Sequence, residues 1–146
     1  MDINGWKIYY FRLFSVQLTN LEKAVKKLKT ESPDTYKHHP KTKLLASVYN
    51  SITNRVPSDP THKQFLLGNT LGKSYRSWRR VKQGLPNRYR LFFKFKATPN
   101  KIVYVWFNDE TTLRKEGAKT DVYVVFCNML KSNRIPDSIY RYPAKW

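Results

Sequence analysis

The sequence predicts a single α+β domain over residues 1–146, in which a small antiparallel sheet packs against an N-terminal helical hairpin and a C-terminal helix follows the sheet. Two patterns predict this class. Apolar residues recur every three or four positions between residues 14 and 56, as along one face of a helix, and they alternate with polar residues from residue 88 onwards, as in strands. A chain of 146 residues has the usual length of one domain, and no internal repeat divides it.

The first predicted elements are a strand and a long helix. Residues 6–11 are mostly aromatic or β-branched, which favours a strand, and Asn4-Gly5 favours a turn before it. From residue 14 the apolar positions take steps of four, three, four and three residues, which predicts a helix with one apolar stripe. This stripe consists of Phe14, Leu18, Leu21, Val25 and Leu28.

A second helix completes the hairpin. Ser32-Pro33-Asp34 interrupts the first helical pattern, and Pro57 to Pro60 ends the second one. Between them the helical spacing returns at Leu44, Leu45, Val48, Tyr49, Ile52 and Val56. Two amphipathic helices joined in this way need another apolar layer to cover them.

The middle of the chain predicts that layer. Residues 78–82 favour a short strand, and residues 88–96 alternate as a strand does. Residues 101–107 are almost continuously apolar, which suits a central strand buried on both faces. Turns at residues 84–87 and 98–100 would connect the three strands as a meander, added to the N-terminal strand. Asp121 can cap a last helix whose apolar face is Val122, Val125, Phe126, Met129 and Leu130.

The net charge is far from neutral. Lys and Arg number 28 against 10 Asp and Glu, so the formal net charge is +18. Repulsion among so many positive charges destabilises a small fold. Such a surface also attracts polyanions, so we expect the partner to be nucleic acid, an anionic membrane or an acidic protein. A membrane is the weakest of these three, because no run of 18 apolar residues exists and the first residues do not have the order of a secretion signal. We expect a cytoplasmic protein.

The cations concentrate on the predicted sheet. No acidic residue occurs between Pro60 and Asn108. Strand alternation places four cations on one face, and Phe92 shares that face with Arg88, Arg90, Lys94 and Lys96. Phe92 would either stack on an RNA base beside these cations or pack under the last helix, and the sequence favours neither.

Familiar catalytic motifs are absent, and so are the residues of a metal site. There is no Gly-rich phosphate loop and no nucleophile elbow. Cys127 is the only cysteine, which excludes a thiolate zinc site and an internal disulfide. The neighbouring His38 and His39 would point in different directions on a helix, so we expect neither a metal nor another cofactor.

RNA cleavage nevertheless needs little beyond cations. The ribose 2'-hydroxyl is the nucleophile, so the protein must align it with the phosphorus, remove its proton, stabilise the phosphorane and protonate the leaving 5'-oxygen. Arginines can stabilise the charge, and clustered cations favour the neutral amine of a neighbouring lysine, which can then act as a base.

Several ordered blocks of the sequence resemble the YhaV family of toxins. These blocks extend from Asn4 to Lys131 and so cover nearly the whole chain. They are Asn4-Gly5-Trp6, residues 78–82 (WRRVK), residues 87–93 (NRYRLFF), residues 106–114 (WFNDETTLR), residues 119–123 (KTDVY) and the segment through Met129-Leu130. One departure is that family members tend to carry a His-Pro pair where this chain has Tyr10 to Leu13.

The resemblance implies a fold, an activity and a set of site residues. YhaV toxins are similar to the wider RelE-like ribonucleases, in which a helical hairpin covers a small antiparallel sheet. The implied function is the toxin of a type II toxin-antitoxin system, a metal-independent endoribonuclease that cuts mRNA or other cellular RNA and so inhibits translation and growth. The implied catalytic residues are Arg80, Lys82, Arg90, Arg114 and Tyr123. The RNA-binding residues that we expect beside them are Arg79, Arg88, Phe92, Lys94, Lys96, Asn108 and Lys119.

Within this set Arg90 is the first candidate. Arg88 and Arg90 share a strand face, and apolar neighbours would fix the backbone of Arg90. The alternative is a surface cation that only positions the substrate. The resemblance suggests Lys82 as base and Tyr123 as acid, roles that are interchangeable at this level, and Tyr123 could instead be a core residue. Asn108 could equally be a cap.

The resemblance also implies partners, and two other functions compete with it. A YhaV toxin is normally held by an antitoxin with a swapped-hairpin DNA-binding fold, and a strongly basic surface suits an acidic, partly disordered segment of such a partner. The target would be RNA, either free or on the ribosome. Charge alone also fits a non-catalytic, ribosome-associated RNA-binding protein. A DNA-binding protein is the third possibility, and the sequence has no helix-turn-helix signature.

Overall fold

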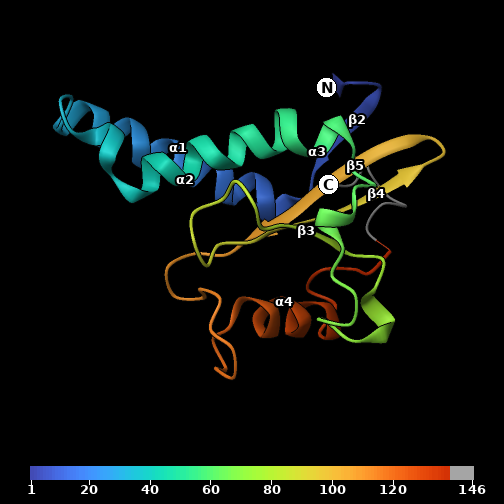
Figure 1. Cartoon of the computed structure of the whole chain (residues 1–146). Coiled ribbons are helices and arrows are strands. Elements are labelled where there is room, and N and C mark those ends of the chain that lie inside the picture. The colour runs from blue at the N-terminus through green and yellow to red at the C-terminus, as the bar shows by residue number, and fades with distance from the viewer. Residues whose placement is uncertain (139–146) are drawn as a thin grey trace.

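The chain folds into three layers, with a sheet between two helical layers (Figure 1). The computed structural model describes residues 1–138. Five strands form one sheet in the order β1-β2-β5-β4-β3. The hairpin of α1 and α2 covers one face, and α4 covers the other. The α+β class and the hairpin packed on a small sheet are therefore confirmed.

The sheet is mixed rather than entirely antiparallel. Its strands are β1 (Asp2–Ile3), β2 (Trp6–Tyr10), β3 (Arg79–Val81), β4 (Leu91–Ala97) and β5 (Asn100–Phe107). Strand β2 runs parallel to β5, and the other pairs are antiparallel. The tight turn between β4 and β5 fixes the direction of β5, and β2 then adds to its free edge in the same direction. The expectation of a purely antiparallel sheet is wrong at this one pairing.

The helices follow the apolar periodicity. Helix α1 spans Arg12–Glu31, and α2 spans Pro40–Asn50. Pro40 occupies the first turn of α2, where a missing N–H is harmless, and the imidazole Nδ1 of His39 caps that helix by accepting the Lys41 N–H. Short 3-10 turns occur at Tyr36–His38, Lys63–Phe65 and Lys73–Tyr75.

The second helix ends in an unusual way. After α2 the chain makes a π turn over Ser51–Arg55 and then a last turn, α3 (Val56–Ser58). Pro57 has no N–H to continue an α-helical ladder, and a widened turn commonly accompanies such an interruption. The sequence therefore predicted the end of the helix at the right place and missed the local widening.

Two apolar cores lie on the two faces of the sheet. The first holds Phe14, Leu18, Val48 and Ile52 from the hairpin against Phe93 and Tyr104. The second holds α4 (Val122–Lys131) against Phe92, Val103 and Trp106, together with Trp78 from the segment before β3. Because β5 contributes to both cores, the prediction of a central strand buried on both faces is confirmed.

The expected open cationic face is therefore covered. The Phe92 side chain is 0% exposed, and its ring stacks on that of Phe126 with centroids 3.9 Å apart. Its role as a platform for RNA bases is thus contradicted, and of the two possibilities the packing under the last helix is the one observed. Lys94 is also buried, where its ammonium group donates to Asp137 Oδ1 at 3.0 Å. Among the described helices, none combines the length and hydropathy that a membrane span requires.

Candidate active site

The hydroxyl of Tyr123 is the meeting point of three elements. Tyr123 lies on the first turn of α4, and its oxygen accepts the Nε–H groups of Arg80 and Arg90, each at 2.9 Å. Arg80 comes from β3, and Arg90 from the residue before β4. Two guanidinium groups on one phenol oxygen leave its own O–H free to donate elsewhere.

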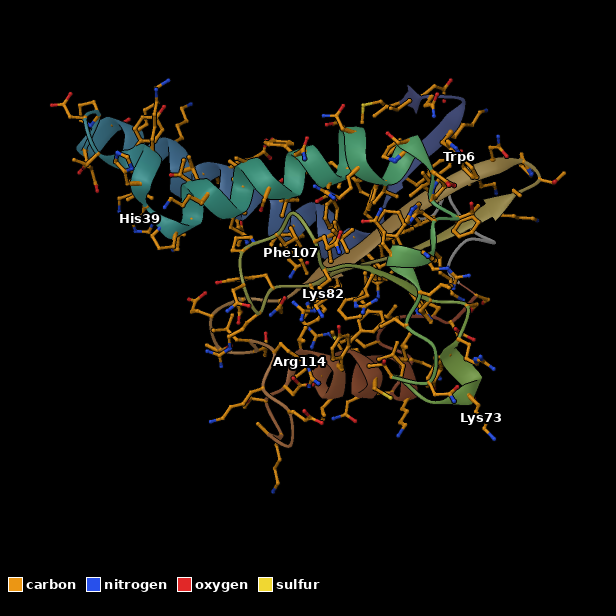
Figure 2. The ribbon with its side chains drawn as sticks, viewed as in Figure 1. Trp6, His39, Lys73, Lys82, Phe107 and Arg114 are labelled. Atoms are coloured by element: carbon orange, nitrogen blue, oxygen red, sulfur yellow. The ribbon has the colours of Figure 1, made fainter. Side chains whose placement is uncertain are left out.

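Arg114 completes the cluster from the loop before α4. Its guanidinium carbon lies 5.1 Å from the centre of the Tyr123 ring, and its Nη1 donates to Asp121 Oδ1 at 2.9 Å. This hydrogen bond raises the pKa of Arg114, which keeps the group charged. Figure 2 shows Arg114 at the N-terminal end of α4. We call Arg80, Arg90, Arg114 and Tyr123 the Tyr123 cluster.

Asp121 holds the cluster together. Its carboxylate accepts Arg114, the backbone N–H of Lys115 at 2.6 Å and the backbone N–H of Tyr123 at 3.2 Å, so it caps α4 as predicted. Burial alone would raise the pKa of Asp121, but the hydrogen bonds from Arg114 and Lys115 lower it below its ordinary value. The ion pair between Asp121 and Arg114 was not predicted, because it depends on the path of the loop that carries Arg114.

Asn108 plays a structural part that the sequence did not predict. Its side chain accepts the Arg90 N–H at 2.7 Å and donates to the carbonyls of Arg88 at 3.1 Å and Thr112 at 2.9 Å. Only 1% of Asn108 is exposed, so it cannot contact RNA in this structure. Its expected RNA-binding role is contradicted, and it instead fixes the backbone on both sides of the cluster.

Backbone carbonyls hold the arginines in place. Arg80 Nη1 donates to the Leu66 carbonyl at 2.6 Å, and Arg90 Nη1 donates to the Tyr89 carbonyl at 2.8 Å. Among residues 1–138, the Nη2 groups of these two arginines have no hydrogen-bond partner. Arg90 is only 7% exposed, which rules out the simple surface cation considered above.

Lys82 lies next to the cluster without being part of it. It follows the end of β3 and is exposed, and strand alternation directs residues 80 and 82 to the same face. In the view of Figure 2, Lys82 lies between the sheet and the N-terminal end of α4. Its amine is thus free to move toward a bound substrate.

A pocket opens onto the cluster. It has a volume of about 350 Å³, and its wall includes Arg114, Asp121 and Tyr123. A larger cavity of about 440 Å³ lies between the helical hairpin and the loop after β5. Asp109 and Glu110 line that larger cavity, which makes it a poor site for a phosphate, so the smaller pocket is the better candidate.

Other expected RNA-binding residues lie outside the cluster. The guanidinium of Arg79 packs over the ring of Phe95 at 5.5 Å, and burial lowers its pKa. Lys96 is exposed, but it lies about 20 Å along β4 from Arg90. Lys119 is exposed in the loop before α4. Arg88 is exposed in a turn with φ of 71°, and its Nε donates to the Arg114 carbonyl.

This arrangement can bind an anion and transfer a proton. Three guanidinium groups surround one phenol, so a phosphate placed against them would meet preorganised donors and a neighbouring O–H group. Among residues 1–138, no three His, Cys, Asp or Glu side chains are grouped so as to hold a metal ion.

Comparison with known proteins places the chain in a class of nuclease toxins. A family model described as a toxin with endonuclease activity, of a toxin-antitoxin system, matches residues 8–144. The Ribonuclease toxin YhaV of Escherichia coli K12 is 39% identical over 135 residues, which is 92% of this chain and 87% of that protein. The Toxin YhaV of Escherichia coli O157:H7 matches to the same extent. No solved structure matches the chain.

The chain belongs to the YhaV toxin family. This membership confirms the resemblance found in the sequence, and it gives the chain the family's endonuclease activity within a toxin-antitoxin system.

Proposed function

We propose that this protein is a metal-independent endoribonuclease that cleaves RNA by attack of a ribose 2'-hydroxyl on the adjacent phosphate. The observation that carries the proposal is the convergence of Arg80 and Arg90 on the Tyr123 hydroxyl, with Arg114 against the ring. Its relative from Escherichia coli K12 is named a ribonuclease toxin, which supports RNA as the substrate.

The arginines bind the phosphate in this proposal. Arg80 and Arg114 are partly exposed and offer N–H groups to the two non-bridging oxygens of the phosphate. Arg90 is buried and adds its positive charge behind them. As the phosphorane forms, negative charge grows on these oxygens, so the fixed guanidinium groups stabilise the transition state more than the ground state. Removal of one such donor costs on the order of a hundredfold in rate.

Two proton transfers complete the reaction. The side-chain nitrogen of Lys82 takes the 2'-hydroxyl proton as the bond from the 2'-oxygen to phosphorus forms. Tyr123 gives its proton to the 5'-oxygen as the bond from phosphorus to that oxygen breaks, and the phenolate left behind is held by the Nε–H groups of Arg80 and Arg90. The products are a 2',3'-cyclic phosphate and a 5'-hydroxyl, and exchange with water restores both side chains.

The end groups of the products test this mechanism. Purified protein should cleave single-stranded RNA in excess EDTA, and mass spectrometry of the fragments should find cyclic phosphate and 5'-hydroxyl ends. Fragments with 3'-hydroxyl and 5'-phosphate ends, or a strict need for magnesium, would overturn it. A protein that binds RNA but cuts it neither free nor on translating ribosomes would support the non-catalytic alternative.

The cellular partners belong to the same proposal. The substrate is mRNA or other RNA in the cytoplasm, either free or on the ribosome, and its loss inhibits translation. The antitoxin has a swapped-hairpin DNA-binding domain and an acidic segment that covers the Tyr123 cluster, because a basic surface of net charge +18 attracts such a segment. Co-expression of the antitoxin should protect RNA, and cleavage that continues within a stable complex would contradict this mode of inhibition.

A further inference from the structure

The pocket beside the Tyr123 cluster extends along the outer face of α4. Tyr123 and Arg114 form part of its wall, so a molecule in the pocket would touch the cluster directly. Its volume of about 350 Å³ falls at the lower end of the range of small-ligand pockets, which is roughly 300–1,000 Å³.

Four residues of α4 line the pocket with both apolar and polar groups. Val124, Cys127, Asn128 and Lys131 line the pocket, and their spacing places them on one face of the helix. Val124 is 41% exposed although it is apolar, and Asn128 presents an exposed side-chain amide. Apolar surface next to an amide is what a nucleobase requires for packing and for hydrogen bonds at its edge.

The loop before β3 contributes Thr70 to the pocket and contacts α4. Thr70 lines the pocket, and its hydroxyl donates to the Leu67 carbonyl at 2.7 Å. Cys127 Sγ donates to the Leu71 carbonyl at 3.5 Å, which ties this loop to α4. These contacts place Thr70 beside the pocket-lining face of α4.

The charges of the pocket favour a nucleotide strand. Arg114 and Lys131 are its cations, and the carboxylate of Asp121 is already satisfied by Arg114 and by two backbone N–H groups. Arg114 belongs to the phosphate-binding cluster, and Lys131 is on the last turn of α4, about 13 Å from Val122 along the helix axis. A nucleotide in the pocket would therefore have Arg114 and Lys131 available to bind its phosphates.

We propose that this pocket holds the nucleobase of the RNA nucleotide next to the cleaved linkage, with Asn128 reading the base edge and Lys131 contacting the following phosphate. The proposal rests on the proposed ribonuclease function and identifies the part of the site that sets base preference.

Filling the pocket is the first test. The substrates are four short single-stranded RNAs that differ only in the base next to the mapped cleavage position. Val124→Trp should lower kcat/KM by about tenfold on the preferred RNA, the loss expected when one base contact is removed. The matched control is Val16→Trp, since Val16 is also an exposed valine on a helix, 58% exposed on α1, and this variant should cleave normally.

Two further variants separate base reading from charge. Asn128→Ala should reduce the rate difference among the four RNAs, because only the preferred base loses hydrogen bonds. Lys131→Gln should slow all four equally, since a phosphate contact carries no base information. Both residues are exposed, and thermal melts check that each variant remains folded. If Val124→Trp does not fold, Asn128→Ala decides the question.

The outcomes distinguish this inference from the proposed function. If the wild type cleaves RNA and the variants retain its rates and base preference, the nucleobase site is wrong and the ribonuclease stands. If Val124→Trp cleaves normally but escapes the antitoxin, the pocket binds a protein segment instead. A wild type that cleaves RNA neither free nor on translating ribosomes overturns the ribonuclease proposal itself.

Discussion

A single phenol oxygen organises the proposed active site. The two arginines that bind the hydroxyl of Tyr123 are 43 and 33 residues away in the sequence, and each also donates to a nearby backbone carbonyl. Each guanidinium group is therefore oriented before a substrate arrives. Such preorganisation is the usual source of electrostatic catalysis, because little free energy is lost in reorienting dipoles during the reaction.

Replacing this oxygen should impair the chemistry more than the binding. Tyr123→Phe keeps the ring against Phe92 and Arg114 but removes both the proton donor and the acceptor of two arginines. We expect kcat to fall by about 10²–10⁴, the usual contribution of a general acid, with KM little changed. Single-turnover cleavage of a short RNA measures this directly.

The matched control for this variant is Tyr36→Phe. Tyr36 is a half-buried tyrosine in the turn between the two long helices, far along the chain from the cluster. Its replacement should leave kcat unchanged. If Tyr123→Phe keeps full kcat, Tyr123 is not the general acid, and its hydroxyl serves only to position Arg80 and Arg90.

At the scale of elements, helix α4 depends on its N-terminal cap for both stability and site geometry. Asp121 accepts the N–H of Tyr123 in the first turn and also binds Arg114, so one carboxylate orients two members of the cluster. Asp121→Ala should lower the free energy of unfolding by about 1–2 kcal/mol through loss of the cap. It should lower the cleavage rate as well.

The contribution of Asp121 to stability should depend on pH. The pKa of Asp121 is lower in the folded protein than its ordinary value of 3.8, so ionised Asp121 favours the folded state. This stabilisation is fully present above the unfolded value and is lost as the pH falls through the lower folded value. Asn at this position can still cap the helix but does not titrate.

Urea titrations of the wild type and Asp121→Asn at several pH values check this expectation. The difference between their free energies of unfolding should be largest at neutral pH and should shrink below about pH 4. Asp34→Asn, at an exposed position in the turn between the helices, controls for the general effect of removing a negative charge. A difference that stays constant down to pH 2 would show that Asp121 acts only as a cap.

The elements themselves were largely predictable, and their mutual arrangement was not. Apolar periodicity gave α1, α2 and α4, and Asp121 marked the start of α4 correctly. Strand β1 has two residues and therefore no pattern to detect. The alternation of residues 88–96 assigned side chains to two faces correctly, but it carries no information about what covers each face. For this reason the burial of Lys94 was missed, and the choice between RNA stacking and packing under α4 stayed open for Phe92.

The site followed a similar division. The resemblance to YhaV toxins named Arg80, Arg90, Arg114 and Tyr123, and the structure brings these four together. The alternation of residues 88–96 had predicted an open cationic face, because the pattern of a single strand contains no information about the helix that packs on it. Asn108 and Asp121 act through contacts between loops, which depend on the tertiary fold rather than on local pattern.

At the scale of the whole molecule, the positive charge is spread over two opposite faces of the sheet. Helix α1 carries four lysines, Lys23, Lys26, Lys27 and Lys29, all of which are exposed. Tyr123, which binds Arg80 and Arg90, and Lys131 belong to α4, and α4 covers the other face of the sheet (Figure 1). If RNA binds along α4, the lysines of α1 contribute only a long-range attraction, which salt screens. The cations beside α4 contact the phosphates directly.

The salt dependence of RNA binding should separate these two groups of cations. Binding of a non-cleavable 2'-O-methyl RNA, measured by fluorescence anisotropy, should weaken as salt rises, and each phosphate contact to a single strand contributes about 0.7 to the slope of log Kd against log salt. Replacing Lys131 with Gln should therefore reduce the slope by about 0.7, although only one charge is removed. Replacing the four α1 lysines with Gln should leave the slope nearly unchanged, although four charges are lost. The reverse result would mean that RNA crosses the helical hairpin, and the α4 face would then no longer be the binding surface.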